Sequence, residues 1–152
     1  MLTDTSQHQL AVVDRELIGT TIRAFFEARR RGDAASMADC CTPQVCFSFV
    51  SASGSNGFHG PVIGRGGIAR ALRAMETEIE MLGYEIVAII IDGARAAVRR
   101  RVTMRGRGTG VTRHFEIFDY LRMEGSLVAE LEQYADTHAI ETARGLSGAS
   151  SL

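Results

Sequence analysis

The chain has 152 residues, of which 45% are hydrophobic, and this is enough for one globular domain with a sizeable core. Seventeen Lys and Arg residues against eighteen Asp and Glu give a formal net charge of -1, so the overall charge supports neither a nucleic-acid-binding nor an anionic-membrane role. The longest apolar run, residues 86–91, is far too short to span a bilayer, and residues 1–11 lack the pattern of a signal peptide.

The first predicted element is an amphipathic helix over residues 14–31, preceded by an N-terminal arm, residues 1–13. Gly32 is expected to end this helix, and Asp33 to cap a short second helix that ends near Cys41. The apolar side chains that recur at three- and four-residue spacing are Val13, Leu17, Ile18, Ile22, Phe25 and Phe26.

The middle of the chain predicts one strand, one loop and one helix. Side chains alternate over residues 45–50 after Pro43, as in a strand. Residues 51–67 are rich in Gly and Ser and predict a flexible loop. Helical apolar spacing over residues 68–82 then predicts a third helix, which Gly83 is expected to stop.

From residue 84 to 136 the pattern is that of β structure. We expect strands over residues 84–91 and 95–105, and two further strands within residues 113–136, with turns at Asp92-Gly93, residues 106–110 and Glu124-Gly125. Residues 140–152 are expected to be a flexible tail. The predicted fold class is α+β: a cone-shaped, strongly curved mixed or antiparallel sheet, with three helices from the N-terminal half on its concave face.

A single carboxylate interrupts the apolar face of a late strand. Phe115, Ile117, Asp119, Leu121 and Met123 alternate along the chain and should share one face of the sheet. Because an unpaired buried charge is very costly, Asp119 must be paired, neutralised or exposed to a cavity. This position is therefore a candidate catalytic residue in a lined pocket.

Arg100 interrupts the apolar face of the preceding strand in the same way, among Ala96, Val98, Val102 and Met104. Opposite charges on the inner faces of adjacent strands predict a hydrogen-bonded pair with Asp119. Such a pair favours the ionised carboxylate, which suits orientation or anion binding better than acid donation. Two interpretations of Asp119 stay open: an acid/base in the pocket, or a structural partner of Arg100.

Further residues are expected to line the pocket around a small, largely apolar ligand. Gln133 should face inward and supply one neutral polar group. His59 lies in the Gly-rich loop, where a lid would be, although a histidine in a loop is often incidental. The expected apolar walls are Phe25, Phe47, Phe49, Phe115 and Leu131.

The outward face of the late strands carries aromatic side chains. Phe118 and Tyr120 share this face with His114 and Glu116. Aromatic residues in alternate positions are unusual on a solvated surface, so this face is predicted to form a homodimer interface.

The three cysteines are predicted to be reduced thiols. Cys40, Cys41 and Cys46 are odd in number, and two of them are adjacent, which does not fit a disulfide framework. Their setting favours a cytoplasmic location. No zinc-binding pattern is completed by histidine or by a second cysteine pair, so no metal site is expected.

The order of these motifs resembles the nuclear transport factor 2-like superfamily, in its SnoaL-like and ketosteroid-isomerase-like branch. The matching motifs are ARRRGD, CCTPQVCFSF, IGRGGIARAL, DGARAAVRRRV and FDYLRMEGSLVAELEQYAD, within residues 14–139. The resemblance implies one cone-shaped SnoaL-like domain over these residues. It does not settle the activity, because the superfamily has many functions.

Two mechanisms known in this superfamily are disfavoured by the residues present. The catalytic base and tyrosine of ketosteroid isomerases fall on Phe49 and Phe25, and only their acid, at Asp119, is present. The two aspartates of limonene epoxide hydrolases fall on Val102 and Gln133, neither of which can activate water.

Of the mechanisms known in this superfamily, that of SnoaL-type polyketide cyclases is the most compatible with the residues present, because it uses a single aspartate. The resemblance implies an acid/base lyase, cyclase or isomerase reaction without metal or organic cofactor, with Asp119 as the acid/base. Arg100 would orient that carboxylate or stabilise an oxyanion. The alternative function is a non-catalytic ligand-binding or accessory dimeric module of the same fold.

Overall fold

The computed structural model describes the backbone of residues 4–50 and 61–145, and side chains from residue 14 onward. Its elements are α1 (Asp4–Arg31), α2 (Ala34–Asp39), β1 (Cys41–Val50), β2 (Val62–Ile63), α3 (Gly64–Glu78), β3 (Ile79–Asp92), β4 (Arg95–Gly106), β5 (Thr112–Glu124), β6 (Leu127–Ala135) and α4 (Thr137–Arg144). None of the described helices is long and apolar enough to cross a membrane.

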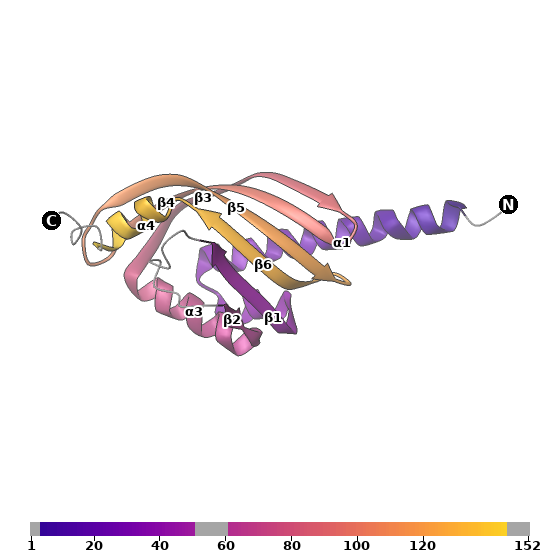
Figure 1. Ribbon diagram of the computed structural model, residues 1–152, viewed down its shortest axis with the longest axis horizontal. Helices are drawn as coiled ribbons and strands as arrows, with labels where there is room; N and C mark the ends of the chain where they lie inside the picture. Colours follow the sequence, from indigo (N-terminus) through magenta and orange to yellow (C-terminus); the bar gives the residue numbers. More distant parts are fainter. Residues whose placement is uncertain (1–3, 51–60, 146–152) are drawn as a thin grey trace.

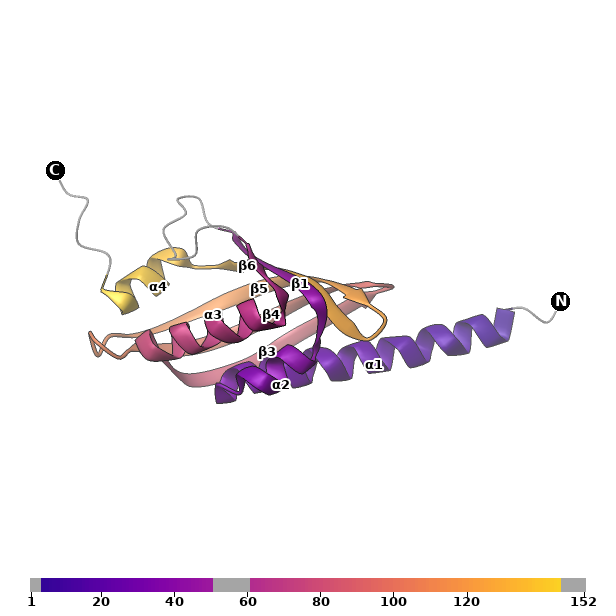
Figure 2. The ribbon, with the colours of Figure 1, turned by 90° about the horizontal axis from the view of Figure 1, so that it is seen from below.

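The strands form one curved sheet of six strands in the order β2-β1-β6-β5-β4-β3. Strands β1 and β6 are parallel, and every other neighbouring pair is antiparallel. The sheet arches over α1 and α3, and Figure 2 shows α1, α2 and α3 on one side of it. This arrangement confirms the predicted α+β cone (Figure 1).

The predicted hairpin turns are confirmed. Gly93, Gly110 and Gly125 adopt positive φ angles of 55°, 70° and 58° in the turns that join β3 to β4, β4 to β5 and β5 to β6. Glycine adopts this backbone conformation at little cost, because it has no Cβ atom. No helix interrupts residues 85–136, all of which the structure describes.

The boundary between the third helix and the sheet was predicted wrongly. Helix α3 ends at Glu78, and Ile79 and Leu82 belong to β3 instead. Their spacing fits a helix, but they adopt strand conformation, because β3 pairs with β4 along most of its length. Gly83 does not stop a helix: it lies inside β3, paired with Thr103.

The two ends of the domain also differ from the prediction. Helix α1 begins at Asp4, within the predicted arm, and its first turns project beyond the sheet in Figure 1. Neither Gly nor Pro occurs between residues 4 and 18, so no local breaker stops the helix. Residues 140–144, predicted as tail, lie in α4, which Asp136 and Gly145 cap. Strand β1 starts at Cys41, and the predicted loop contains β2.

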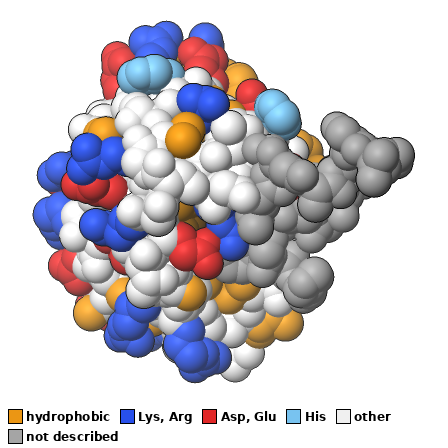
Figure 3. Space-filling view, turned by 90° about the vertical axis from the view of Figure 1, so that its left-hand side faces the viewer, with side chains coloured by type: hydrophobic (Ala, Val, Ile, Leu, Met, Phe, Trp, Pro, Cys, Tyr) orange, Lys and Arg blue, Asp and Glu red, His pale blue; other side chains and the backbone are white. Residues whose placement is uncertain are grey.

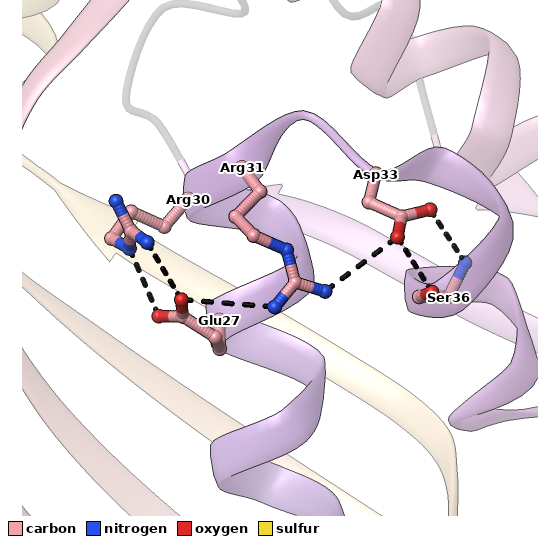
Figure 4. Close-up of polar contacts among 5 residues, drawn as sticks. All are labelled: Glu27, Arg30, Arg31, Asp33 and Ser36. Atoms are coloured by element: carbon pink, nitrogen blue, oxygen red, sulfur yellow. Dashed lines mark hydrogen bonds and ion pairs between the residues drawn. The ribbon is translucent and has the colours of Figure 1, made fainter.

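Polar side chains fix the turn between α1 and α2, as Figure 4 shows. The carboxylate of Glu27 accepts hydrogen bonds from Arg30 Nη2 at 2.7 Å and from Arg30 Nε at 2.9 Å. Arg31 Nη2 lies 3.5 Å from Asp33 Oδ2. As predicted, Asp33 caps α2: it accepts from the Ser36 backbone N–H at 3.0 Å and from its hydroxyl at 2.7 Å. These bonds lower the pKa of Asp33, so its cap is strongest above the ordinary carboxylate range and weakens as the pH falls.

The core lies between the helices and the concave face of the sheet. Buried side chains of α1 meet those of the central strands, and each is at most 4% exposed: Ile18, Ile22, Phe25, Phe26, Val98, Leu121 and Leu131. The opposite face of the sheet remains apolar in places: Ile90, Phe118, Tyr120 and Tyr134 are 43 to 66% exposed. The predicted outward direction of Phe118 and Tyr120 is therefore confirmed.

Candidate functional site

A buried ion pair lies at the centre of the sheet, as the sequence predicts. Arg100 on β4 donates from Nε to Asp119 Oδ2 at 2.6 Å and from Nη2 to Oδ1 at 3.0 Å. Asp119 is paired in register with Val98, and Arg100 with Ile117, so the two charged residues are diagonal neighbours on one face. Both side chains are fully buried, and each oxygen of the carboxylate accepts one of these bonds.

The surroundings of Arg100 complete a small polar cluster. Gln133 on β6 lies opposite Asp119 and accepts from Arg100 Nη2 at 3.3 Å, which confirms that it faces inward. The Phe26 ring covers the guanidinium, with its centroid 4.3 Å from the central carbon. Arg100 Nη1 has no hydrogen-bond partner in the part of the chain that the structure describes.

A cavity of about 130 Å³ lies beside this cluster, between α3, α4, the end of β1 and the sheet. Its lining is mostly apolar: Phe49, Val50, Ala74, Met75, Ile79, Met104, Ala135 and Ile140, together with Arg29, Glu78, Gln133, Thr137 and Arg144. Figure 3 faces the end of the molecule that carries α4, where acidic and basic side chains lie beside one another with hydrophobic ones between them. At this end, Arg144 of α4 donates to Glu78 of α3 at 2.6 Å.

The cavity contains only part of the predicted site. Phe49 and Gln133 line it, whereas Asp119 and Arg100 do not. The sheet pattern correctly showed that these side chains point inward, but it carried no information on which inward positions the helices fill. The other four predicted wall residues, Phe25, Phe47, Phe115 and Leu131, are buried elsewhere in the core. His59 lies outside the described residues.

Sequence reasoning missed Arg29, in the last turn of α1. It is 4% exposed and lines the cavity. Its Nη2 group donates only to the weak acceptor Met75 Sδ, at 3.7 Å, and its buried Nε has no partner among the described residues. Burial, with a smaller contribution from the charge of Arg100, lowers the pKa of Arg29 to about 10.

A signal for Arg29 was present in the helix periodicity. Ile22, Phe25, Phe26 and Arg29 stand at positions i, i+3, i+4 and i+7, which is one face of a helix. The run of three arginines hides it, because Arg30 and Arg31 are exposed. A basic run at a helix end is usually solvated, since cations there interact well with the helix dipole.

Among the described residues, the cavity wall offers hydrogen-bond donors but no unbonded carboxylate that could act as a general base. Glu78 is the one carboxylate among its described lining residues, and it is bonded to Arg144. Among the described residues, no group of three His, Cys, Asp or Glu side chains could hold a metal ion. Cys41 is a buried thiol whose pKa burial raises to about 12, so it is a small core residue rather than a nucleophile.

A family model described as a SnoaL-like domain matches residues 22–131. Three solved structures illustrate the likeness in fold. A putative isomerase from Bacillus subtilis has a TM-score of 0.78 at 14% identity, over 88% of this chain and 96% of that one. An NTF2-like protein from Burkholderia xenovorans has a TM-score of 0.72 at 21% identity, over 85% and 96%. TerC, co-crystallised with polyporic acid, has a TM-score of 0.70 at 19% identity, over 85% and 98%.

These matches confirm the superfamily that the sequence motifs resemble. At such identities the solved structures show the fold alone. No curated protein sequence matches the chain.

Proposed function

The chain belongs to the SnoaL-like domain family, and we propose that it binds a small, largely apolar molecule in the cavity between α3, α4 and the sheet. The observation that carries this proposal is a cavity with mostly apolar walls and two buried polar side chains, Arg29 and Gln133. Such a lining is typical of small-molecule sites. The volume of about 130 Å³ is close to that of an engineered cavity of about 150 Å³ that binds benzene.

Acid/base chemistry on that ligand, without metal or organic cofactor, is a second candidate function. Its support is a chain of hydrogen bonds from Gln133, on the cavity wall, through Arg100 to Asp119. In a lyase, cyclase or isomerase reaction, Arg100 would polarise the amide of Gln133. The amide N–H groups of Gln133 would then donate to an oxyanion that develops on the ligand. Asp119 itself stands behind the wall, so the binding function, with or without catalysis, is the better supported of the two.

Filling the cavity should abolish ligand binding. Ala135, on the wall, is replaced by leucine, whose larger side chain would occupy the space intended for the ligand. A panel of small aromatic molecules is screened by thermal shift, and hits are measured by calorimetry on both proteins. We expect hits to raise the melting temperature of the wild type and to bind at least about tenfold more weakly to Ala135→Leu, since overlapping volumes exclude each other.

The matched control is Ala94→Leu, which enlarges an exposed alanine in the turn between β3 and β4. This variant should bind the same hits as the wild type. Circular dichroism checks that both variants are folded. Hits that bind Ala135→Leu as tightly as the wild type would place the ligand outside the cavity and refute the proposed function.

We further propose that the outer face of the sheet is covered by a second copy of the chain. Ile90, Phe118, Tyr120 and Tyr134 form an exposed apolar group on β3, β5 and β6. At the edge of this group, Arg99 donates to Glu116 at 2.8 Å and lowers the pKa of that carboxyl group. An apolar centre with a charged rim is typical of a protein interface.

Phe118→Glu should convert this dimer to a monomer, because the new charge would be buried at the centre of the interface. Sedimentation velocity reports the mass of both proteins, and the wild-type interface should bury roughly 800 Å² per partner. Thr77→Glu, which adds the same charge at an exposed position on α3, should stay dimeric. A wild-type monomer at micromolar concentration would contradict the proposed dimer.

A further inference from the structure

Arg29 is a buried cation that forms no ion pair with a carboxylate among the described residues. Among the described residues, the other buried charged side chains are Arg100 and Asp119, and those two are bonded to each other. Among the described residues, no carboxylate oxygen lies within 4.0 Å of a nitrogen of the Arg29 guanidinium. The described interior therefore holds two positive charges and one negative charge, and Arg29 carries the excess.

Several other groups influence Arg29 electrostatically, but among the described residues none of them is bonded to it. Asp119, Tyr84 and Glu76 each favour its charged form, and Arg100 disfavours it. The carboxylate of Asp119 is already engaged by Arg100 through two hydrogen bonds. Tyr84 is a phenol whose pKa burial raises, so it is neutral near pH 7 and offers no negative charge.

The charge on Arg29 persists at neutral pH despite its burial. Its pKa, lowered to about 10, still lies well above 7, so the guanidinium stays protonated. Keeping an unpaired charge away from water is costly, and buried polar groups without partners are rare in native proteins. The Arg29 side chain forms part of the wall of the cavity described above, and most of the other residues of that wall are apolar.

We propose, on the basis of the ligand cavity described above, that the cavity selects a small apolar molecule with one carboxylate, and that Arg29 binds this carboxylate. The guanidinium offers donors in a planar arrangement that matches a carboxylate. Met75, Ile79, Met104 and Ile140 contact the apolar part of the ligand, and Gln133 supplies a second donor. A ligand anion also cancels the excess positive charge in the interior.

A pair of probes of the same shape tests the selectivity for an anion. Benzoate and benzamide each have a single ring, which suits a cavity of about 130 Å³, and only benzoate is charged at pH 7. Calorimetry on the full chain should show benzoate binding at least about tenfold more tightly than benzamide, because a charge-assisted hydrogen bond is the stronger one.

Variants at two neighbouring arginines test the assignment to Arg29. Arg29→Met keeps an unbranched chain without the charge, and it should remove the preference for benzoate, so that the two probes bind this variant within about threefold of each other. Arg29→Lys should retain part of the preference. Arg30→Met is the matched control, because Arg30 is exposed and bonded to Glu27, and it should behave as the wild type. Without ligand, Arg29→Met should melt at a higher temperature, since an unpaired buried charge is removed.

The outcomes separate this inference from the proposed function. Equal binding of the two probes, or a preference that survives in Arg29→Met, would overturn the role of Arg29 and leave the cavity as an apolar binding site. Equal binding would also be expected if Glu76, which shares a smaller space of about 10 Å³ with Arg29, neutralised it through a water molecule. Benzoate binding that Ala135→Leu does not weaken would place the anion elsewhere and overturn the inference. Binding of neither probe would count against the proposed function as well.

Discussion

Replacing Arg100 with alanine should lower the free energy of unfolding by about 3 kcal/mol or more. The change removes both hydrogen bonds to Asp119 and leaves a fully buried carboxylate without a partner. It also removes the group that the Phe26 ring covers. Because small domains unfold at a cost of about 5–15 kcal/mol, this loss should be obvious in urea denaturation at pH 7.

Two comparisons show whether the loss comes from the unpaired charge. Arg99→Ala, on the same strand but at a partly exposed ion pair, should cost far less. The double variant Arg100→Met/Asp119→Leu should recover most of the stability, since apolar residues can replace a buried ion pair. Equal stability of wild type and Arg100→Ala would mean that water reaches Asp119, and the account of a sealed pair would then be wrong.

Phe26→Ala should destabilise the domain by about 3–5 kcal/mol. The Phe26 ring is 1% exposed, lies edge-on to Phe25 with 5.0 Å between centroids, and covers the Arg100 guanidinium. Its removal leaves a void at the contact between α1 and the sheet and opens the polar cluster. Chemical denaturation monitored by far-ultraviolet circular dichroism measures the loss.

The size of this effect depends on burial, and an exposed phenylalanine provides the contrast. Phe118→Ala, at a position that is 52% exposed in the isolated chain, should change the stability of the monomeric form little. Phe26→Leu should fall between the two, because it retains most of the apolar volume but loses the ring above Arg100. A Phe26→Ala protein as stable as Phe118→Ala would show that α1 does not pack as described.

The sheet and its ion pair were predictable because both depend on a two-residue period. Asp119 and Arg100 each interrupt an apolar alternation, and opposite charges at such positions on neighbouring strands have few stable arrangements other than a pair. The turns were predictable for a local reason as well, since Asp92-Gly93 and Glu124-Gly125 carry their own conformational preference.

The ends of the helices were not predictable in the same way. Ile79 and Leu82 continue the helical spacing of α3, but long-range pairing with β4 draws them into β3. Helix α4 is short and lies in a segment rich in small residues, so neither length nor periodicity marks it. Contacts that are remote in sequence decide both cases.

The cavity itself depends on which buried positions remain unfilled, and no periodic pattern encodes this. Phe25 and Phe47 were expected to line the cavity, but they pack against each other with ring centroids 5.6 Å apart. Arg29 does line it, although it stands in a basic run that resembles a solvated helix end. The helix period places Arg29 on the inward face of α1, but only the packing of α1 and α3 on the sheet determines which inward side chains border the cavity.

A crystal structure of the full chain grown with benzoate tests the ligand cavity most directly. We expect density for one ring between Met75, Met104 and Ile140, with the carboxylate within hydrogen-bond distance of Arg29. The Arg100–Asp119 pair should be unchanged beside it. An empty cavity in crystals that hold benzoate at another site would contradict the proposed binding of a carboxylate by Arg29.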